Sequence, residues 1–256
     1  MKFTVFTLLA AIVACTTNAQ STKPNIRGEL LAQWDRQLRR KTEAMLEPNA
    51  NFDIKTLWTV GETTDDGYTP PGIFDGMGAY ALDDDTVRLL VNHELSHTRG
   101  YPYSMMNGLT LTGARVSYFD IDKKSMKVTD SGMAYDKLYD VDGNIATALT
   151  DLFPESYQGL SRFCSGRLVV PGQFESGSGL VDLIYFAPEE TSARVEDQNG
   201  AIAGHIWALD VHGNALWDIG AMGRGAWENL APVDTGNPAT VGFILADDTS
   251  PVRVGM

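Results

Sequence analysis

From Pro48 onward the chain is a succession of short β-type runs closed by turns, and this pattern limits the possible fold more than any other feature. Each run is rich in apolar, β-branched or aromatic residues, and Gly, Pro, Asn and Asp separate the runs. The runs span residues 54–60, 86–92, 114–121, 125–129, 167–170, 181–187, 205–211, 215–219 and 241–246. We therefore predict a mainly β body over residues 49–256, with an insert at 135–158 that carries a short helix at 145–153.

Two of these runs share one pattern. The run 116–121 is followed by a turn at 122–124, and the run 206–211 is followed by a turn at 212–214. Each combines aromatic and aliphatic residues, has an Asp near its end and leads into a returning strand. Repeated antiparallel hairpins are typical of propeller blades, whose radial packing protects their edges. A β-sandwich gives a similar pattern, so the hairpins alone leave both architectures open.

The first 19 residues have the composition of a signal peptide. Lys2 precedes an uncharged stretch at 3–14, and small and polar residues follow it. Two processing sites compete: the tripeptide Thr-Asn-Ala suits cleavage before Gln20, whereas Ile-Val-Ala-Cys resembles a lipobox, in which Cys15 would receive a lipid anchor. Both processing sites predict a protein outside the cytoplasm. Cleavage before Gln20 would give a periplasmic or secreted protein, and the lipobox would give an outer-membrane lipoprotein.

We predict a separate helical segment over residues 20–48. An apolar stripe over 26–46, with basic residues largely off it, predicts one amphipathic packing helix. No later segment stays apolar for long enough to cross a bilayer, so we expect no transmembrane span.

The charge of the chain argues against nucleic acid as a partner. The formal net charge is -13, with 33 acidic and 20 basic residues. A nucleic-acid backbone is held mainly by basic side chains, so an acidic surface does not favour it. Clustered carboxylates are instead the ligands that calcium prefers.

Cys164 is the only cysteine beyond the signal peptide. A lone thiol in an exported protein cannot form an internal disulfide and is exposed to oxidants. Two interpretations follow: Cys164 is a small buried hydrophobe, or it is a metal ligand. The residues that the fold brings close to it decide between them.

The stretch from His93 to His97, His-Glu-Leu-Ser-His, matches the zinc-protease pattern. That chemistry needs both histidines on one helical face, Glu94 as general base, and a third protein ligand. Tyr103 stands where the extended motif has its last histidine, and 87–91 has the pattern of a buried strand. A zinc metalloprotease is therefore the weaker hypothesis, and a match by chance within a strand and turn is the stronger one.

Acidic pairs follow two predicted strands. Glu189 and Glu190 come directly after 183–187, and Asp247 and Asp248 come directly after 243–246. Carboxylates at strand ends can converge at one mouth of a barrel or propeller, where they repel one another unless cations neutralise them. Taken together with the unpaired thiol, they predict a metal site.

The order of the motifs resembles the PhoX-type alkaline phosphatases. The resemblance covers roughly residues 72–248, which include Asp75-Gly76-Met77-Gly78-Ala79. It rests on the segments Asn92-His93-Glu94, Cys164-Ser165-Gly166, Glu189-Glu190, Gly223-Arg224 to Glu228, and Asp247-Asp248. It implies an exported β-propeller whose active site holds calcium and iron and hydrolyses phosphate monoesters, with a small-molecule phosphate ester as its partner.

The resemblance also implies roles for single residues. Metal ligands would be Cys164, Glu189, Glu190 and Glu228, with Asp247 or Asp248 as an additional calcium ligand and with His93 and Glu94 in or beside the same site. Arg224 or Arg162 would bind phosphate. Carboxylates suit calcium, whereas a thiolate with carboxylates suits iron.

This chain departs from the family pattern in three places. Pro188 stands where the family often has a cysteine, Trp227 replaces a histidine, and further strands would be expected after Met256. We therefore expect an incomplete propeller, about half to two thirds of a six-bladed one. Trp227 and the missing C-terminal strands favour a rival hypothesis, a non-catalytic calcium-binding propeller that acts as a surface or interaction module, whereas Cys164 and the Glu189-Glu190 pair favour the enzyme.

Overall fold

The computed structural model describes residues 54–153, 155–174, 177–191, 204–248 and 254–255. The chain divides into two compact units, residues 1–62 and 63–256. The helix predicted at 26–46 lies outside the described residues. The strand predicted at 54–60 is wrong, because this stretch pairs with no strand among the described residues and is an irregular segment that ends in a turn.

The described part of the second unit is mainly β, which confirms the predicted class. No α-helix occurs in the described residues, and none of them forms a helix with the length and apolarity of a membrane span. The helix predicted at 145–153 is wrong: only a 3₁₀ turn forms, η1 (Leu149–Asp151). The Asp151 carboxylate accepts the backbone N–H groups of Thr147 and Ala148, which closes a single turn. A second 3₁₀ turn is η2 (Gly220–Met222).

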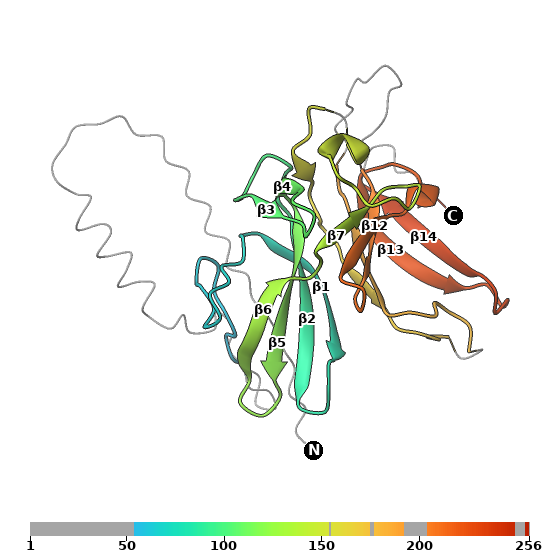
Figure 1. The fold of residues 1–256 in the computed structure, drawn as a ribbon. Coiled ribbons are helices and arrows are strands. Elements are labelled where there is room, and N and C mark those ends of the chain that lie inside the picture. The colour runs from blue at the N-terminus through green and yellow to red at the C-terminus, as the bar shows by residue number, and fades with distance from the viewer. Residues whose placement is uncertain (1–53, 154, 175–176, 192–203, 249–253, 256) are drawn as a thin grey trace. The chain divides into compact units, whose positions relative to one another are not determined.

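The first sheet is antiparallel, with the order β1-β2-β5-β6 (Figure 1). Its strands are β1 (Phe74–Ala81), β2 (Thr86–His93), β5 (Arg115–Asp122) and β6 (Lys127–Met133). Apolar residues form the middle of β2 and are interspersed with polar residues in β5. The two strands pair from Thr86 with Asp122 to His93 with Arg115.

The second sheet has the order β7-β12-β11-β10-β9. Its strands are β7 (Lys137–Tyr139), β12 (Ala215–Asp218), β11 (Ile206–Asp210), β10 (Ile184–Pro188) and β9 (Arg167–Val169). Only β7 and β12 are parallel. The two hairpins predicted from their shared pattern are confirmed, because β5 pairs with β6 and β11 pairs with β12 in the antiparallel sense.

Two three-stranded sheets complete the described part. One contains β13 (Trp227–Asp234), β14 (Val241–Asp247) and β15 (Val254–Gly255), and the other contains β3 (Tyr103–Ser104), β4 (Thr110–Gly113) and β8 (Gly159–Leu160). All four sheets are open, so the described strands form no closed ring.

Two apolar clusters form the core. The larger one joins the first two sheets and includes Leu90, Val116 and Trp207, and the smaller one packs β10 and β11 against β13 and β14 around Phe186 and Trp227. Burial of these side chains is the main stabilising contribution to such a fold.

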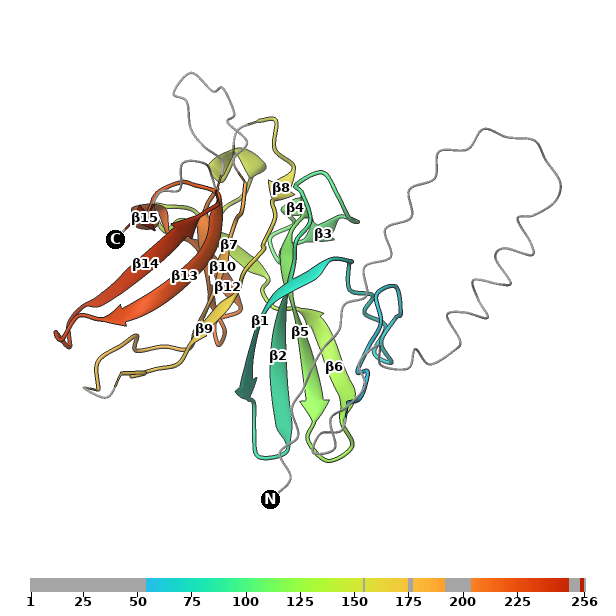
Figure 2. The ribbon, with the colours of Figure 1, turned by 180° about the vertical axis from the view of Figure 1, so that it is seen from behind.

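Glycines allow β1 to approach the segment that leads into β9 (Figure 2). A Cβ atom on Gly76 would lie 2.1 Å from the backbone nitrogen of Gly166. A Cβ atom on Gly166 would in turn lie 2.0 Å from the hydroxyl of Tyr185. Any larger residue at either position would force the backbones apart. The close approach places Asp75 next to the loop that contains Cys164.

Candidate metal centre

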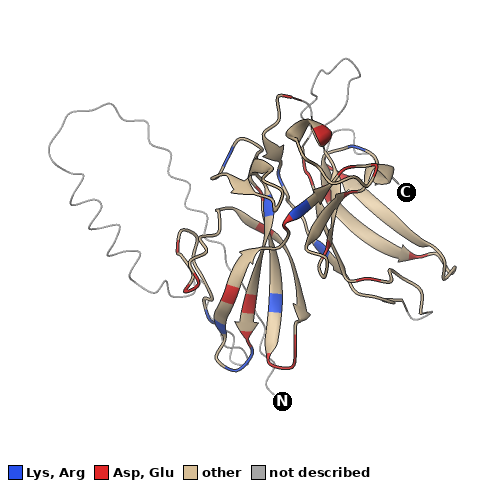
Figure 3. Cartoon of the chain, viewed as in Figure 1, with Lys and Arg blue, Asp and Glu red and all other residues tan. Residues whose placement is uncertain are grey.

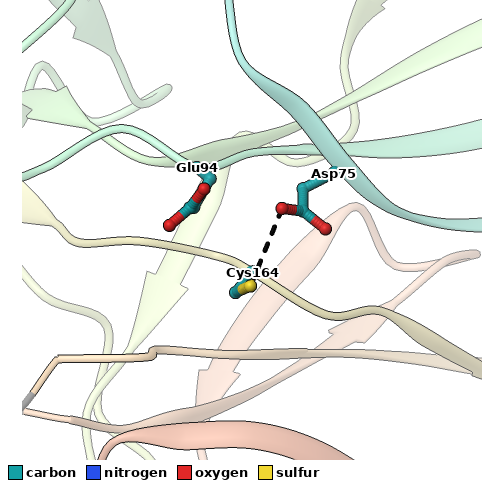
Figure 4. A group of neighbouring side chains, drawn as sticks. All are labelled: Asp75, Glu94 and Cys164. Carbon is teal, nitrogen blue, oxygen red and sulfur yellow. Dashed lines mark hydrogen bonds between the residues drawn. The ribbon is translucent and has the colours of Figure 1, made fainter. Parts of the chain in front are cut away.

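Five segments of the second unit bring four carboxylates and one thiol together. They are Asp75 in β1, Glu94 after β2, Cys164 between β8 and β9, Glu190 after β10, and Glu228 in β13. Within Asp75, Glu94 and Cys164 (Figure 4), and again within Cys164, Glu190 and Glu228, the potential ligand atoms lie within 4.8 Å of one another. We call these five residues the acid–thiol cluster. Cys164 belongs to both groups of three.

A buried polar network fixes the loop that carries Cys164. The N–H of Gly76 donates to the carbonyl of Cys164 at 3.0 Å, and Nδ2 of Asn92 donates to the carbonyl of Ser165 at 2.6 Å. The hydroxyl of Tyr185 lies 2.9 Å from the Gly76 carbonyl and 3.0 Å from Oδ1 of Asn92. Asn92 and Tyr185 are fully buried. The motifs around residues 92 and 164 therefore hold each other in place, which pre-organises the thiol.

Backbone strain is concentrated beside the cluster. Only four non-glycine residues in the described part have a positive φ, and two of them, Ile73 (57°) and Arg162 (51°), flank it. The carbonyl of Ile73 accepts the N–H of Glu94 at 2.9 Å, and the carbonyl of Arg162 accepts the N–H of Glu190 at 2.9 Å. Such a conformation costs about 1–3 kcal/mol per residue and is typical of functional sites.

Arg162 is the cation in direct contact with this cluster. Its Nη2 donates to Oε2 of Glu190 at 2.6 Å and lies 2.9 Å from Oε1 of Glu94. Arg162, which we predicted to bind phosphate, is therefore already paired with two carboxylates. Hydrogen bonds from Arg162 and Cys164 outweigh burial and lower the pKa of Glu190.

Asp75 and Glu94 have raised pKa values. Burial raises the pKa of Asp75, and the charges of Glu228 and Glu190 raise it further. Burial also raises the pKa of Glu94, although Arg162 partly offsets it. Acidic side chains lie on many turns and strands of the described chain (Figure 3), in keeping with its net charge of -13. A bound cation would relieve the repulsion in the cluster.

The neighbouring carboxylates also affect the thiol of Cys164. Its sulfur donates to Oδ2 of Asp75 at 3.7 Å, and its pKa is raised by burial and by the Asp75 charge. Without a cation the thiol stays protonated at neutral pH. A metal ion reverses this preference, because a coordinating thiol is deprotonated.

Glu189 lies apart from the cluster, although it precedes Glu190 in the chain. Its Oε1 accepts the N–H of Ser161 at 2.7 Å and its Oε2 accepts the N–H of His205 at 3.0 Å. The side chain is almost completely buried. Both carboxylate oxygens of this predicted ligand therefore already have backbone donors.

Arg224 also lies in this neighbouring environment. Its two terminal nitrogens donate to both oxygens of Asp218 at 3.2 Å, and Nδ1 of His205 lies 2.6 Å from Oδ2 of the same Asp218. We call Glu189, His205, Asp218 and Arg224 the closed polar group. Neither His205 nor Asp218 belongs to a recognisable sequence motif, so the sequence alone predicts no role for them.

The acidic pair at the end of β14, Asp247 and Asp248, is divided in a similar way. Asp248 is joined to Glu190 by a side-chain hydrogen bond, so it lies beside the acid–thiol cluster. Asp247 is buried opposite Trp227, and its Oδ1 has no hydrogen-bond partner among the described residues. An unpartnered buried carboxylate oxygen fits a cation better than an apolar neighbour.

The two histidines of the zinc-protease pattern do not share a helical face. His93 ends β2 and is buried, with Nε2 2.7 Å from the hydroxyl oxygen of Ser117. His97 lies beyond β2, and its ring stacks on that of Tyr157 at 4.2 Å. Because His93 is buried and its ring nitrogen already has a hydrogen-bond partner, we interpret it as a structural residue.

Sequence reasoning missed Asp75 as a possible ligand. In the sequence, Asp75 is the first residue of the segment Asp75-Gly76-Met77-Gly78-Ala79 and has no recognisable ligand motif around it. The glycine that follows it is the usable signal, because Gly76 permits the close backbone approach that carries the carboxylate to Cys164.

Comparisons with protein-family models, with curated proteins and with solved structures give no match for this chain. We therefore infer the chemistry of the site from the ligand atoms that it contains. Four carboxylates suit calcium, and a thiolate beside carboxylates suits iron. The acid–thiol cluster thus fits the ions that the resemblance implies.

Proposed function

We propose that this protein is a metal-dependent phosphatase that hydrolyses phosphate monoesters outside the cytoplasm, in the manner of PhoX-type enzymes. The observation that carries the proposal is the acid–thiol cluster, in which five separate segments deliver oxygen and sulfur donors to one place. As part of the proposal, the open sheets belong to a β-propeller, residues 1–19 direct export, and Cys15 is the alternative site of a lipid anchor.

The proposed ions are calcium and iron, held by Cys164, Glu190 and Glu228 on one side and by Asp75 and Glu94 on the other. When bound, such ions polarise phosphoryl oxygens and lower the pKa of bound water. The carboxylates fix the charge of the site, and Arg162 supplies a guanidinium whose planar fork matches a phosphate group. Asn92 and Tyr185 keep the Cys164 loop in one position.

Hydrolysis of a chromogenic phosphate monoester by the full chain tests the proposal. Activity should appear with calcium and iron, disappear with a chelator, and fall at least about 100-fold in Glu228→Gln. Asp130→Asn, on the exposed part of β6, should leave activity unchanged. A folded protein that contains calcium and iron but does not turn over the ester would contradict the proposal.

The non-catalytic alternative has one specific observation in its favour. Both arginines that the resemblance assigns to phosphate, Arg162 and Arg224, are ion-paired with carboxylates. On this alternative the cluster binds calcium and stabilises a surface or interaction module. Calcium binding without turnover under every metal condition is its expected outcome.

A further inference from the structure

The guanidinium of Arg162 connects the two halves of the acid–thiol cluster. Its Nη2 lies 2.6 Å from Oε2 of Glu190 and 2.9 Å from Oε1 of Glu94. Glu190 belongs to one group of potential ligands and Glu94 belongs to the other. The positively charged guanidinium therefore lies between these two carboxylates, in the space that a metal ion bound to both of them would need.

A metal ion and this guanidinium compete for the same oxygens. Both are positive, so they repel each other at close range, and a carboxylate oxygen that coordinates a cation is a weaker partner for arginine. Cation binding to Glu94 and Glu190 therefore weakens both contacts of Arg162.

Arg162 has the freedom to respond. Its side chain is 43% exposed, whereas those of Glu94 and Glu190 are 22% and 13% exposed. The head can therefore turn towards water while the backbone stays fixed by its hydrogen bonds to Leu95 and Glu190. Its Nε is buried and has no hydrogen-bond partner among the described residues, so the exposed part of the side chain is its terminal part.

Arg224 lacks this freedom. It donates to both oxygens of Asp218, a residue whose side chain is only 2% exposed and which also contacts His205. Releasing Arg224 would leave a buried carboxylate with one partner fewer, which is costly. Of the two arginines, Arg162 is the one that metal binding can free.

We propose that Arg162 is an exchangeable counter-ion: it neutralises Glu94 and Glu190 in the metal-free protein, and cation binding transfers its guanidinium to a tetrahedral oxyanion such as phosphate. The inference rests on the metal centre of the proposed function and adds that the cation and the anion bind cooperatively. By linkage, phosphate must then tighten cation binding by the same factor.

Calorimetric titrations of the full chain test this exchange. Calcium alone is titrated into the wild type, Arg162→Gln and Arg88→Gln, and inorganic phosphate is then titrated with and without saturating calcium. Arg88→Gln is the matched control, because it removes an arginine–carboxylate pair, with Asp120, from the first sheet. Circular dichroism confirms that each variant is folded.

We expect Arg162→Gln to bind calcium about tenfold more tightly, because a competing cation is gone, and to lose calcium-dependent phosphate binding. Arg162→Lys should recover part of the phosphate binding, and Arg88→Gln should keep the affinities of the wild type. Unchanged or weaker calcium binding by folded Arg162→Gln would overturn the exchange. So would a lack of calcium binding by the wild type and the variant alike.

The outcomes for the exchange and for the phosphatase are separable, because neither titration depends on turnover. Tighter calcium binding and lost phosphate binding in Arg162→Gln, without hydrolysis by the wild type, would support the exchange and contradict the phosphatase. Hydrolysis by the wild type with unchanged calcium affinity in the variant would do the reverse.

Discussion

Glu189 and Glu190 are consecutive in the chain but belong to environments of opposite character. In the closed polar group, both oxygens of Glu189 and both oxygens of Asp218 have nitrogen donors. In the acid–thiol cluster, burial raises the pKa values of Asp75, Glu94 and Cys164. Burial raises the pKa of Glu189 as well, and the pKa of Glu190 is lowered, so the two environments differ in their hydrogen-bond donors and not in the direction of their pKa shifts. Nitrogen donors surround the carboxylates of the first environment, whereas the second gathers several carboxylates around one thiol. The contrast separates residues that hold the fold from residues available to a ligand.

The closed polar group should be the more sensitive of the two to loss of a carboxylate. Asp218→Asn removes the carboxylate that His205 and Arg224 contact, and we expect it to lower the free energy of unfolding by about 3 kcal/mol. Urea unfolding of metal-free protein measures the loss. Asp75→Asn is the comparison within the cluster and should cause no loss. Equal losses in both variants would remove the distinction between the two environments.

Glu189→Gln should have the next largest effect. The amide keeps one acceptor but places an N–H₂ group against a backbone N–H, so we expect a loss of about 2 kcal/mol. The number of calcium ions bound at saturation should not change, because Glu189 uses its oxygens for Ser161 and His205. If instead a bound ion disappears while urea stability is retained, Glu189 is a ligand and the division between the groups is misplaced.

The pH dependence should show a smaller difference. The pKa values of Asp75 and Glu94 are raised above 3.8 and 4.5, so the folded protein holds these protons more tightly than the unfolded chain does. Their contribution to stability is therefore present below about pH 4 and is lost as the pH rises through the folded-state pKa. Between pH 4 and 7, metal-free wild type should lose stability relative to Asp75→Asn, and calcium should restore it. Parallel pH profiles would show that the Asp75 pKa is not raised.

The strands were predictable where burial dictates their composition. The β-branched and aliphatic runs of β2 and β5 identify them, and the hairpin of β11 and β12 follows from its turn. β1 was missed because Gly76 and Gly78 resemble a turn, although Gly76 admits the backbone of Gly166 and Gly78 makes room for the side chains of Leu168 and Tyr185. Composition reports local preference, whereas such an approach depends on tertiary packing.

The candidate site was predictable in its chemistry but not in its membership. The motif order placed Cys164, Glu190 and Glu228 in one metal site, and the fold brings these three together. It also grouped Glu189 with Glu190, but adjacent residues of an extended chain point to opposite sides. Which of the two glutamates faces Cys164 depends on the strand register and on the β-bridge between Glu190 and Ala226. The motif predicts neither of these.

Cobalt(II) titration of the full chain, followed by near-ultraviolet absorption, tests the central claim that the acid–thiol cluster binds metal through Cys164. We predict a thiolate-to-cobalt charge-transfer band that saturates with the metal, is absent in folded Cys164→Ser and persists in Glu189→Gln. A folded wild-type protein that develops no such band, or a Cys164→Ser variant that retains it, would contradict the account.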